Sequence, residues 1–210
     1  MENARIVYAL YMGFFALLMG SILITPYLAF SSDMGGVYGA FAATCHQKLS
    51  RSLCLFNGAG GYWIGDCVPQ TGAYVENDRT QIRVQNDSVT GYKLPVCSRD
   101  IGLYGAMLLG GLIYPFVKKI GDRKVYPAIW LVVAIVPLGL DGSIQLVSEL
   151  GLLPFVYEST NLIRLLTGAI AGIAAAFYAI PILVNIFSRD EPAAKAIAGA
   201  APQPKARRKS

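Results

Sequence analysis

Four long apolar runs restrict this sequence to a small set of folds. They cover residues 6–30, 101–117, 125–147 and 162–187. A helix needs about 20 apolar residues to cross the hydrocarbon core of a bilayer. Three of the runs reach that length, and the second reaches it if the helix extends at either end. Each run therefore predicts a transmembrane helix.

The first run could instead be a cleaved signal peptide. Its length argues against this alternative, because the apolar core of a signal peptide spans only about 7–15 residues and a small-residue cleavage site should follow it. We therefore expect an all-α integral membrane protein with four transmembrane helices. A weaker amphipathic stretch over residues 37–56 could add an interfacial helix.

The distribution of charge predicts which side of the membrane each connection occupies. The amino end, residues 118–124 and residues 188–210 together carry a net charge of +7, whereas residues 31–100 and 148–161 carry −2. Lys and Arg gather on the cytoplasmic side of membrane proteins. We therefore expect a multi-pass protein of the cell membrane with both termini cytoplasmic. The total charge of +5 needs no nucleic acid to explain it, and membrane lipids are the expected partners.

The domain organisation follows from the same runs. We expect one polytopic membrane domain over residues 1–187 and a disordered, basic cytoplasmic tail over residues 188–210. The tail joins an Ala-rich stretch to the sequence PQPKARRKS. It has too few large apolar residues to form a core, and its positive charge attracts anionic lipid headgroups.

Residues 31–100 predict a small extracytoplasmic loop region. Within it, Ile82, Val84 and Val89 alternate with polar residues around the turn-forming triplet NDS, a pattern typical of a short hairpin. Residues 57–96, about 40 residues, are too few for an independent core, so this piece should pack on the outer helix ends. The same triplet makes Asn86 a candidate for N-glycosylation.

All the cysteines lie in this outside region, at Cys45, Cys54, Cys67 and Cys97. An even number on the oxidising face of a membrane favours disulfides. Four cysteines allow three pairings, and their spacing alone does not choose between them. Alternatively, zinc could be bound if the thiols stay reduced, with the ligands Cys45, His46, Cys97 and Asp100. No other cofactor is expected.

Short polar motifs in the apolar background resemble a known family. The motifs are CHQKLSRS, PVCSRDIGLYGAMLLGG, LDGSIQL and ESTNLIRLLTGAIAG, and they extend from about Cys45 to Gly172. Together they resemble the domain of unknown function 2085 family, which comprises predicted small membrane proteins. The resemblance implies an integral membrane protein, and it implies no reaction.

The match can be followed residue by residue. The matching positions are Cys45, His46, Gln47, Arg51, Ser52, Cys97, Arg99, Gly102, Tyr104, Asp141, Gly142, Gln145, Glu158, Ser159, Thr160, Asn161, Arg164, Thr167 and Gly168. The sequence departs from the family at Asp100, which replaces the second Cys of a Cys-x-x-Cys pair. Cys54 and Cys67 are additions to the family pattern, and Cys67 lies in an unusually long gap. The resemblance therefore implies one disulfide between Cys54 and Cys67 and another between Cys45 and Cys97.

Polar side chains within or beside the apolar runs are predicted to gather in the outer third of the bilayer. They are His46, Gln47, Arg99, Asp141, Gln145, Glu158, Asn161 and Arg164. Asp141 lies about six residues inside the outer end of its run, which is a depth of roughly 9 Å. An ionised side chain in a span costs about 2.5–3.5 kcal/mol and normally finds a partner. We expect Arg164 to be the partner of Asp141, with Arg99 as the competing choice.

The sequence leaves two interpretations of this polar group open. It is either a clasp that fixes the register of the helices or a polar pocket open to the outside. Nearby, the GxxxG spacing of Gly168 and Gly172 indicates a face for close helix packing.

The sequence contains no P-loop, no G-x-S-x-G nucleophile motif, no H-E-x-x-H motif and no C-x-x-C-H haem motif. We therefore expect a non-enzymatic role, as an accessory subunit of a membrane complex or as a small transport-type scaffold with an outward-facing polar pocket. One alternative is a membrane enzyme that acts on a lipid-linked substrate at the outer leaflet through His46, Asp141, Glu158 and Arg164. The other is a zinc or redox-thiol protein.

Overall fold

The computed structural model describes residues 2–43, 45, 48–67, 74–77, 82–86 and 89–187. Within them, the α-helices are α1 (Glu2–Leu28), α2 (Gly35–Ala42), α3 (Ser98–Val117), α4 (Ala128–Glu149) and α5 (Asn161–Phe187). A short 3-10 helix, η1 (Leu49–Arg51), precedes the strands β1 (Leu53–Gly58), β2 (Gly61–Asp66), β3 (Tyr74–Asn77), β4 (Ile82–Asn86) and β5 (Val89–Lys93).

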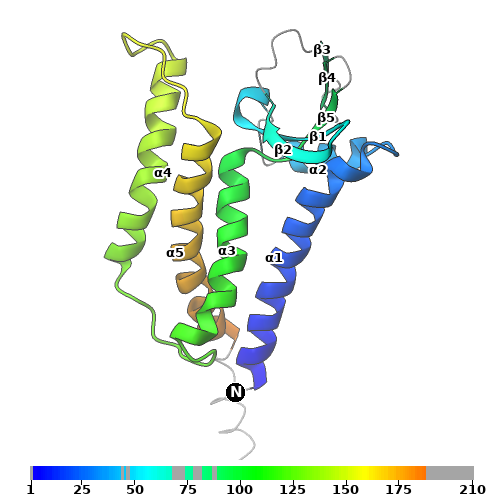
Figure 1. Ribbon diagram of the computed structural model, residues 1–210. Coiled ribbons are helices and arrows are strands. Elements are labelled where there is room, and N and C mark those ends of the chain that lie inside the picture. Colours follow the sequence, from blue (N-terminus) through cyan, green and yellow to red (C-terminus); the bar gives the residue numbers. More distant parts are fainter. Residues whose placement is uncertain are drawn as a thin grey trace, which may run out of the picture.

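In the described part of the chain, four helices are long and apolar enough to cross a membrane. They are α1, α3, α4 and α5, which contain 27, 20, 22 and 27 residues, and they confirm the four helices predicted from the apolar runs. Figure 1 shows that the start of α1 and the end of α5 lie at one end of the bundle. The sheet lies at the opposite end, so the helices alternate in direction.

The expectation of an all-α fold is wrong for the segment between α2 and α3, which contains an antiparallel sheet. Its strand order is β2-β1-β5-β4-β3. The predicted hairpin is present as β4 and β5, which pair from Arg83 opposite Tyr92 to Asn86 opposite Val89. The protein is therefore mostly helical with a small sheet at one end of the bundle.

The interfacial helix expected over residues 37–56 is also wrong beyond Ala42, where α2 ends. From Leu53 the chain continues as β1, in which Cys54 and Phe56 are buried and their neighbours are more exposed. This alternation has a period of two residues, which places one face of a strand against a core.

The buried side of the sheet contains the alternate residues of β1 together with residues in or beside the other strands. Cys54, Phe56, Cys67 and Val84 form one buried cluster. Cys54 and Cys67 are joined by a disulfide with a Cα–Cα distance of 5.0 Å, which confirms that predicted pair. A disulfide that closes a loop of this length stabilises the folded state by about 3 kcal/mol. Such a cross-link supports a small sheet that buries few residues.

Aromatic contacts hold the sheet against the end of α1. The ring centroids of Phe30 and Tyr92 are 4.8 Å apart, and those of Tyr27 and Tyr62 are 5.2 Å apart. Tyr38 of α2 donates a hydrogen bond to the carbonyl of Lys93 at 2.5 Å. The small sheet thus packs on helix ends, as expected for a piece without an independent core.

Helices α3 and α5 pack closely because glycines on each helix lie against the backbone of the other. A Cβ added to Gly102 would lie 2.2 Å from the Leu165 carbonyl oxygen, and one added to Gly168 would lie 2.3 Å from that of Arg99. At Gly172, the same carbon would lie 2.3 Å from the carbonyl oxygen of Leu103. The GxxxG spacing therefore marks a true packing face, where small residues let two backbones approach.

In contrast, α4 leaves most of its large side chains exposed. They include Ile129, Trp130, Val132, Leu140 and Leu146. An apolar, outward-facing surface of this kind suits lipid tails.

Residues 188–210, for which a disordered tail is predicted, lie outside the described residues.

We expect Gly168→Ala to lower the stability of the detergent-solubilised protein by about 1–3 kcal/mol or more, because the added methyl group meets backbone atoms of α3. Thermal or denaturant unfolding of the purified protein measures this change. Gly139→Ala is the matched control, since a Cβ on Gly139 of α4 meets nothing within 4 Å. Equal effects of the two substitutions would contradict the packing described here.

Candidate functional site

Asp141 lies at the centre of the polar contacts at the sheet end of the bundle. It is 6% exposed within α4. Its carboxylate forms an ion pair with Arg99, from the first turn of α3. The Tyr157 hydroxyl donates to Oδ1 at 3.0 Å, and the Ser159 hydroxyl donates to Oδ2 at 3.3 Å. The bond to Asp141 raises the pKa of Tyr157. Donors from two other segments therefore satisfy a charge on an apolar helix.

The direct partner of Asp141 is Arg99, and the prediction of Arg164 is wrong in this respect. Gly142 explains part of the difference, because a Cβ there would lie only 3.3 Å from Nη1 of Arg99. The missing side chain leaves room for the guanidinium group against α4. Arg164 reaches the same carboxylate indirectly, since its Nε donates to the Ser159 hydroxyl at 2.9 Å.

Arg164 is itself buried among polar partners on the first turn of α5. It is 1% exposed. Its Nη1 donates to the carbonyl of Ser50 at 3.4 Å, and its Nη2 lies 3.7 Å from the carboxylate of Glu158. An unpaired arginine at such burial would be costly, and these contacts compensate its charge.

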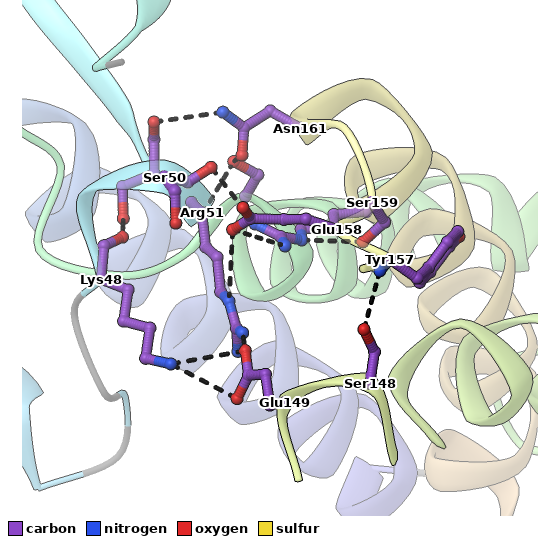
Figure 2. A network of polar contacts seen from close by, with 12 residues as sticks. Lys48, Ser50, Arg51, Ser148, Glu149, Tyr157, Glu158, Ser159 and Asn161 are labelled. Carbon is purple, nitrogen blue, oxygen red and sulfur yellow. Dashed lines mark hydrogen bonds and ion pairs between the residues drawn. The ribbon is translucent and has the colours of Figure 1, made fainter. Parts of the chain in front are cut away.

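A more exposed layer of charges lies above these buried groups. Arg51 of η1 reaches between Glu149 and Glu158, as Figure 2 shows. Lys48 lies 3.3 Å from the same Glu149 carboxylate. These ion pairs connect the segment before β1 to the end of α4 and to the α4–α5 connection.

Asn161 connects the start of α5 to the sheet. Its amide nitrogen donates to the carbonyl of Ser52 at 3.3 Å and to Asp66 at 2.9 Å. Its amide oxygen accepts a bond of 2.6 Å from the hydroxyl of Ser98, at the start of α3. One side chain therefore joins two helices, the end of β2 and the residue before β1.

These residues together form what we call the outer polar cluster. Its members are Lys48, Arg51, Arg99, Asp141, Glu149, Tyr157, Glu158, Ser159, Asn161 and Arg164. Gln145 is also buried, one helical turn from Asp141 on α4. His46 and Gln47 lie outside the described residues. The predicted pocket did not include five members of this cluster, which are Lys48, Arg51, Glu149, Tyr157 and Ser159, although Arg51 and Ser159 are among the positions that match the family motifs. The available signal was the position of Glu149 at the end of α4 and of Tyr157 in the connection that leads to α5.

A second group of side chains, the thiol cluster, consists of Cys45, Cys97 and Asp100. Their two sulfurs and one carboxylate oxygen all lie within 4.8 Å of one another. The predicted Cys45–Cys97 disulfide is not formed in the structure, where both residues are thiols. Cys97 donates to Oδ2 of Asp100 at 3.1 Å. A hydrogen bond with Cys45, together with burial, raises the pKa of Cys97.

Lys93 lies near the thiol cluster at the end of β5. It is fully buried, and its ammonium group donates to the carbonyl of Leu94 at 2.8 Å. Burial lowers the pKa of Lys93 to about 8, while the nearby Cys45 and Cys97 oppose this shift. The thiol cluster thus has a buried amino group beside it, that of Lys93.

The glycosylation candidate Asn86 is the last residue of β4. The two residues that complete its sequon, Asp87 and Ser88, lie outside the described residues. Glycosylation at Asn86 stays a prediction from the sequence.

Apolar helices with paired charges buried near one end are typical of a polytopic helical membrane protein. Residues 81–178 match the model of a family described as a predicted membrane protein, DUF2085. The resemblance inferred from the motifs is therefore confirmed over these residues, and the Cys45–Ser52 motif lies outside them.

A relative described as an uncharacterized protein, from Methanocaldococcus jannaschii, is 28% identical over 174 residues. The match covers 79% of this chain and 85% of the relative. No solved structure matches the chain. These two matches together cover most of the described residues, and neither of them names a reaction.

We expect Asp141→Asn and Arg99→Gln to show an interaction free energy of about 1–3 kcal/mol in a double-mutant cycle, because either change alone leaves a buried charge without its partner. Unfolding of the four proteins in one detergent measures this coupling. The cycle of Asp141→Asn with Arg164→Gln is the comparison, and its coupling should be smaller because only Ser159 links the two side chains. A larger interaction free energy for Asp141 with Arg164 than for Asp141 with Arg99 would contradict the pairing in the structure.

Proposed function

We propose that this protein is a non-enzymatic structural subunit of the cell membrane. In this role, four membrane spans hold the disulfide-bonded sheet outside the membrane, in a fixed orientation for a partner protein. The observation that carries the proposal is the outer polar cluster, which ties the sheet to the ends of three helices.

The contacts support a clasp because Asp141 and Arg164, both buried, each form an ion pair within the described part of the chain. Asp141 is held by Arg99, Tyr157 and Ser159. Asn161 bridges the sheet and the starts of α3 and α5. A network that joins several elements in this way restricts their relative movement and fixes one arrangement.

The alternative roles have less support from the same contacts. A transport pathway needs polar groups that face water, whereas Asp141, Gln145 and Arg164 are all buried. An enzyme needs a carboxylate or imidazole that can move a proton. The carboxylate of Asp141 is held in an ion pair, and His46 lies outside the described residues.

The proposed orientation is supported by the position of the basic residues. Arg5, Lys118, Lys119, Arg123 and Lys124 belong to the end of the bundle opposite the sheet. Lys and Arg gather on the cytoplasmic side, so both termini would be cytoplasmic and the sheet would be extracytoplasmic.

We expect an impermeant maleimide to label Val156→Cys but not Lys119→Cys in intact cells. Val156 is 94% exposed in the connection between α4 and α5, and Lys119 is exposed in the connection between α3 and α4. Peptide mapping locates the label and separates it from the native thiols. Labelling of Lys119→Cys before lysis would refute the orientation, and labelling of both after lysis is the control for reactivity.

The subunit role predicts a stoichiometric protein partner that depends on the orientation of the sheet. Purification of the full chain in a mild detergent should recover that partner with the wild-type protein. Asn161→Ala should reduce its recovery severalfold, because this substitution removes the bonds between α5 and the sheet.

Asn185→Ala is the matched control on the same helix. Asn185 bonds the carbonyl of Arg123 at 2.8 Å, at the opposite end of the bundle. Recovery of the partner with Asn185→Ala and its loss with Asn161→Ala supports the proposal. A wild-type protein that purifies without any stoichiometric partner, or a partner that both variants retain equally, would refute the subunit role.

A further inference from the structure

The thiol cluster lies where three segments of the chain meet. Cys45 follows α2, and its backbone N–H still bonds the carbonyl of Phe41 at 3.1 Å. Cys97 immediately precedes α3, and Asp100 lies in the first turn of that helix. Because Cys97 and Asp100 are three residues apart, the helix places them on the same face.

The positions of the three ligand atoms are close to those that a metal ion requires. The two sulfurs and the carboxylate oxygen all lie within 4.8 Å of one another. In a tetrahedral zinc site, bonds of about 2.0–2.3 Å place neighbouring ligand atoms roughly 3.5–3.8 Å apart. Bringing the three groups onto one ion therefore requires the ligand atoms to approach one another by about 1 Å at most.

The kinds of ligand indicate which ion would bind. Two thiols and one carboxylate make a mixed soft and hard set, which suits Zn²⁺ better than Cu⁺ or Ca²⁺. We propose that Cys45, Cys97 and Asp100 are three ligands of a zinc site at the sheet end of α3. Binding displaces the two thiol protons to solvent and forms two zinc–thiolate bonds and one zinc–carboxylate bond.

The charge around the cluster agrees with this assignment. Two thiolates and one carboxylate carry three negative charges, and Zn²⁺ compensates two of them. Lys93 is buried beside the cluster, and its ammonium form would compensate the third. A site that is neutral as a whole avoids most of the cost of burying charge.

The competing outcome for the same two cysteines is a disulfide. The structure already has one disulfide in this region, Cys54–Cys67, and it keeps Cys45 and Cys97 as thiols. Asp100 has no part in a disulfide, yet its carboxylate accepts a hydrogen bond from Cys97. Zinc accounts for all three side chains. The zinc site does not depend on a partner protein, so its test is independent of the test of the subunit role.

The test uses the full-length protein, purified in detergent with its thiols kept reduced by a phosphine. We expect equimolar zinc after desalting, and a rise in melting temperature when zinc is added to chelator-treated protein. Cys97→Ser and Asp100→Asn should each weaken zinc binding, measured by competition with a chromogenic chelator. Loss of a residue that only hydrogen-bonds a metal ligand weakens binding by about 10–100-fold, and loss of a direct ligand should weaken it by at least as much.

Asp122→Asn is the matched control, because this carboxylate pairs with Lys118 at the other end of the bundle. The variants are compared only if peptide mapping finds the Cys54–Cys67 disulfide intact in each. Asp100→Cys provides a test by gain, since a third sulfur at this position should increase the thiolate-to-cobalt absorption when Co²⁺ replaces Zn²⁺.

Three results would overturn the zinc site. The first is a Cys45–Cys97 disulfide in protein that is alkylated before extraction from cells. The second is reduced wild-type protein that retains no zinc. The third is equal zinc binding by the wild-type protein, Cys97→Ser and Asp100→Asn, which would place the ion elsewhere.

Discussion

A single carboxylate on an apolar helix is the constraint on which the sheet end of this structure depends. Asp141 is buried in α4, and an ionised group within a span costs about 2.5–3.5 kcal/mol without compensation. Its ion pair with Arg99 keeps α3 beside α4. Its bond from Ser159 draws the α4–α5 connection inward, and the same hydroxyl accepts a bond from Arg164 of α5. One charge thus organises three helices.

The helices could be predicted from the sequence because the width of a bilayer sets a minimum length that needs no tertiary information. The sheet could be predicted only in part. Its β4–β5 hairpin is local, with a turn between paired strands, and the sequence indicates it. The pairing of β1 with β5 joins residues far apart in the chain, and no local pattern encodes it. The alternation around Cys54 and Phe56 was present but was interpreted as part of an amphipathic helix.

The polar cluster was predicted from depth, which is a property of position along a helix axis. Asp141, Arg99 and Arg164 lie at a similar depth along their helices, but depth does not determine which faces of the helices are in contact. The choice of Arg99 depends on the glycine contacts between α3 and α5 and on the space beside Gly142. Similarly, the Cys54–Cys67 disulfide follows from the departures of this sequence from the family it resembles. The environment of Cys45 and Cys97 depends on where α2 ends, which the sequence pattern did not locate.

The order of the ion pair along the chain matters for how the protein is made. Arg99 belongs to α3 and Asp141 to α4, so the ribosome completes the cation before it completes the anion. When α4 leaves the insertion machinery, its charged residue meets a helix that already carries the opposite charge. Had Asp141 relied on Arg164, the acid would have entered the bilayer before its partner was synthesised. The pairing observed here allows α4 to insert against a helix that already carries its counter-ion.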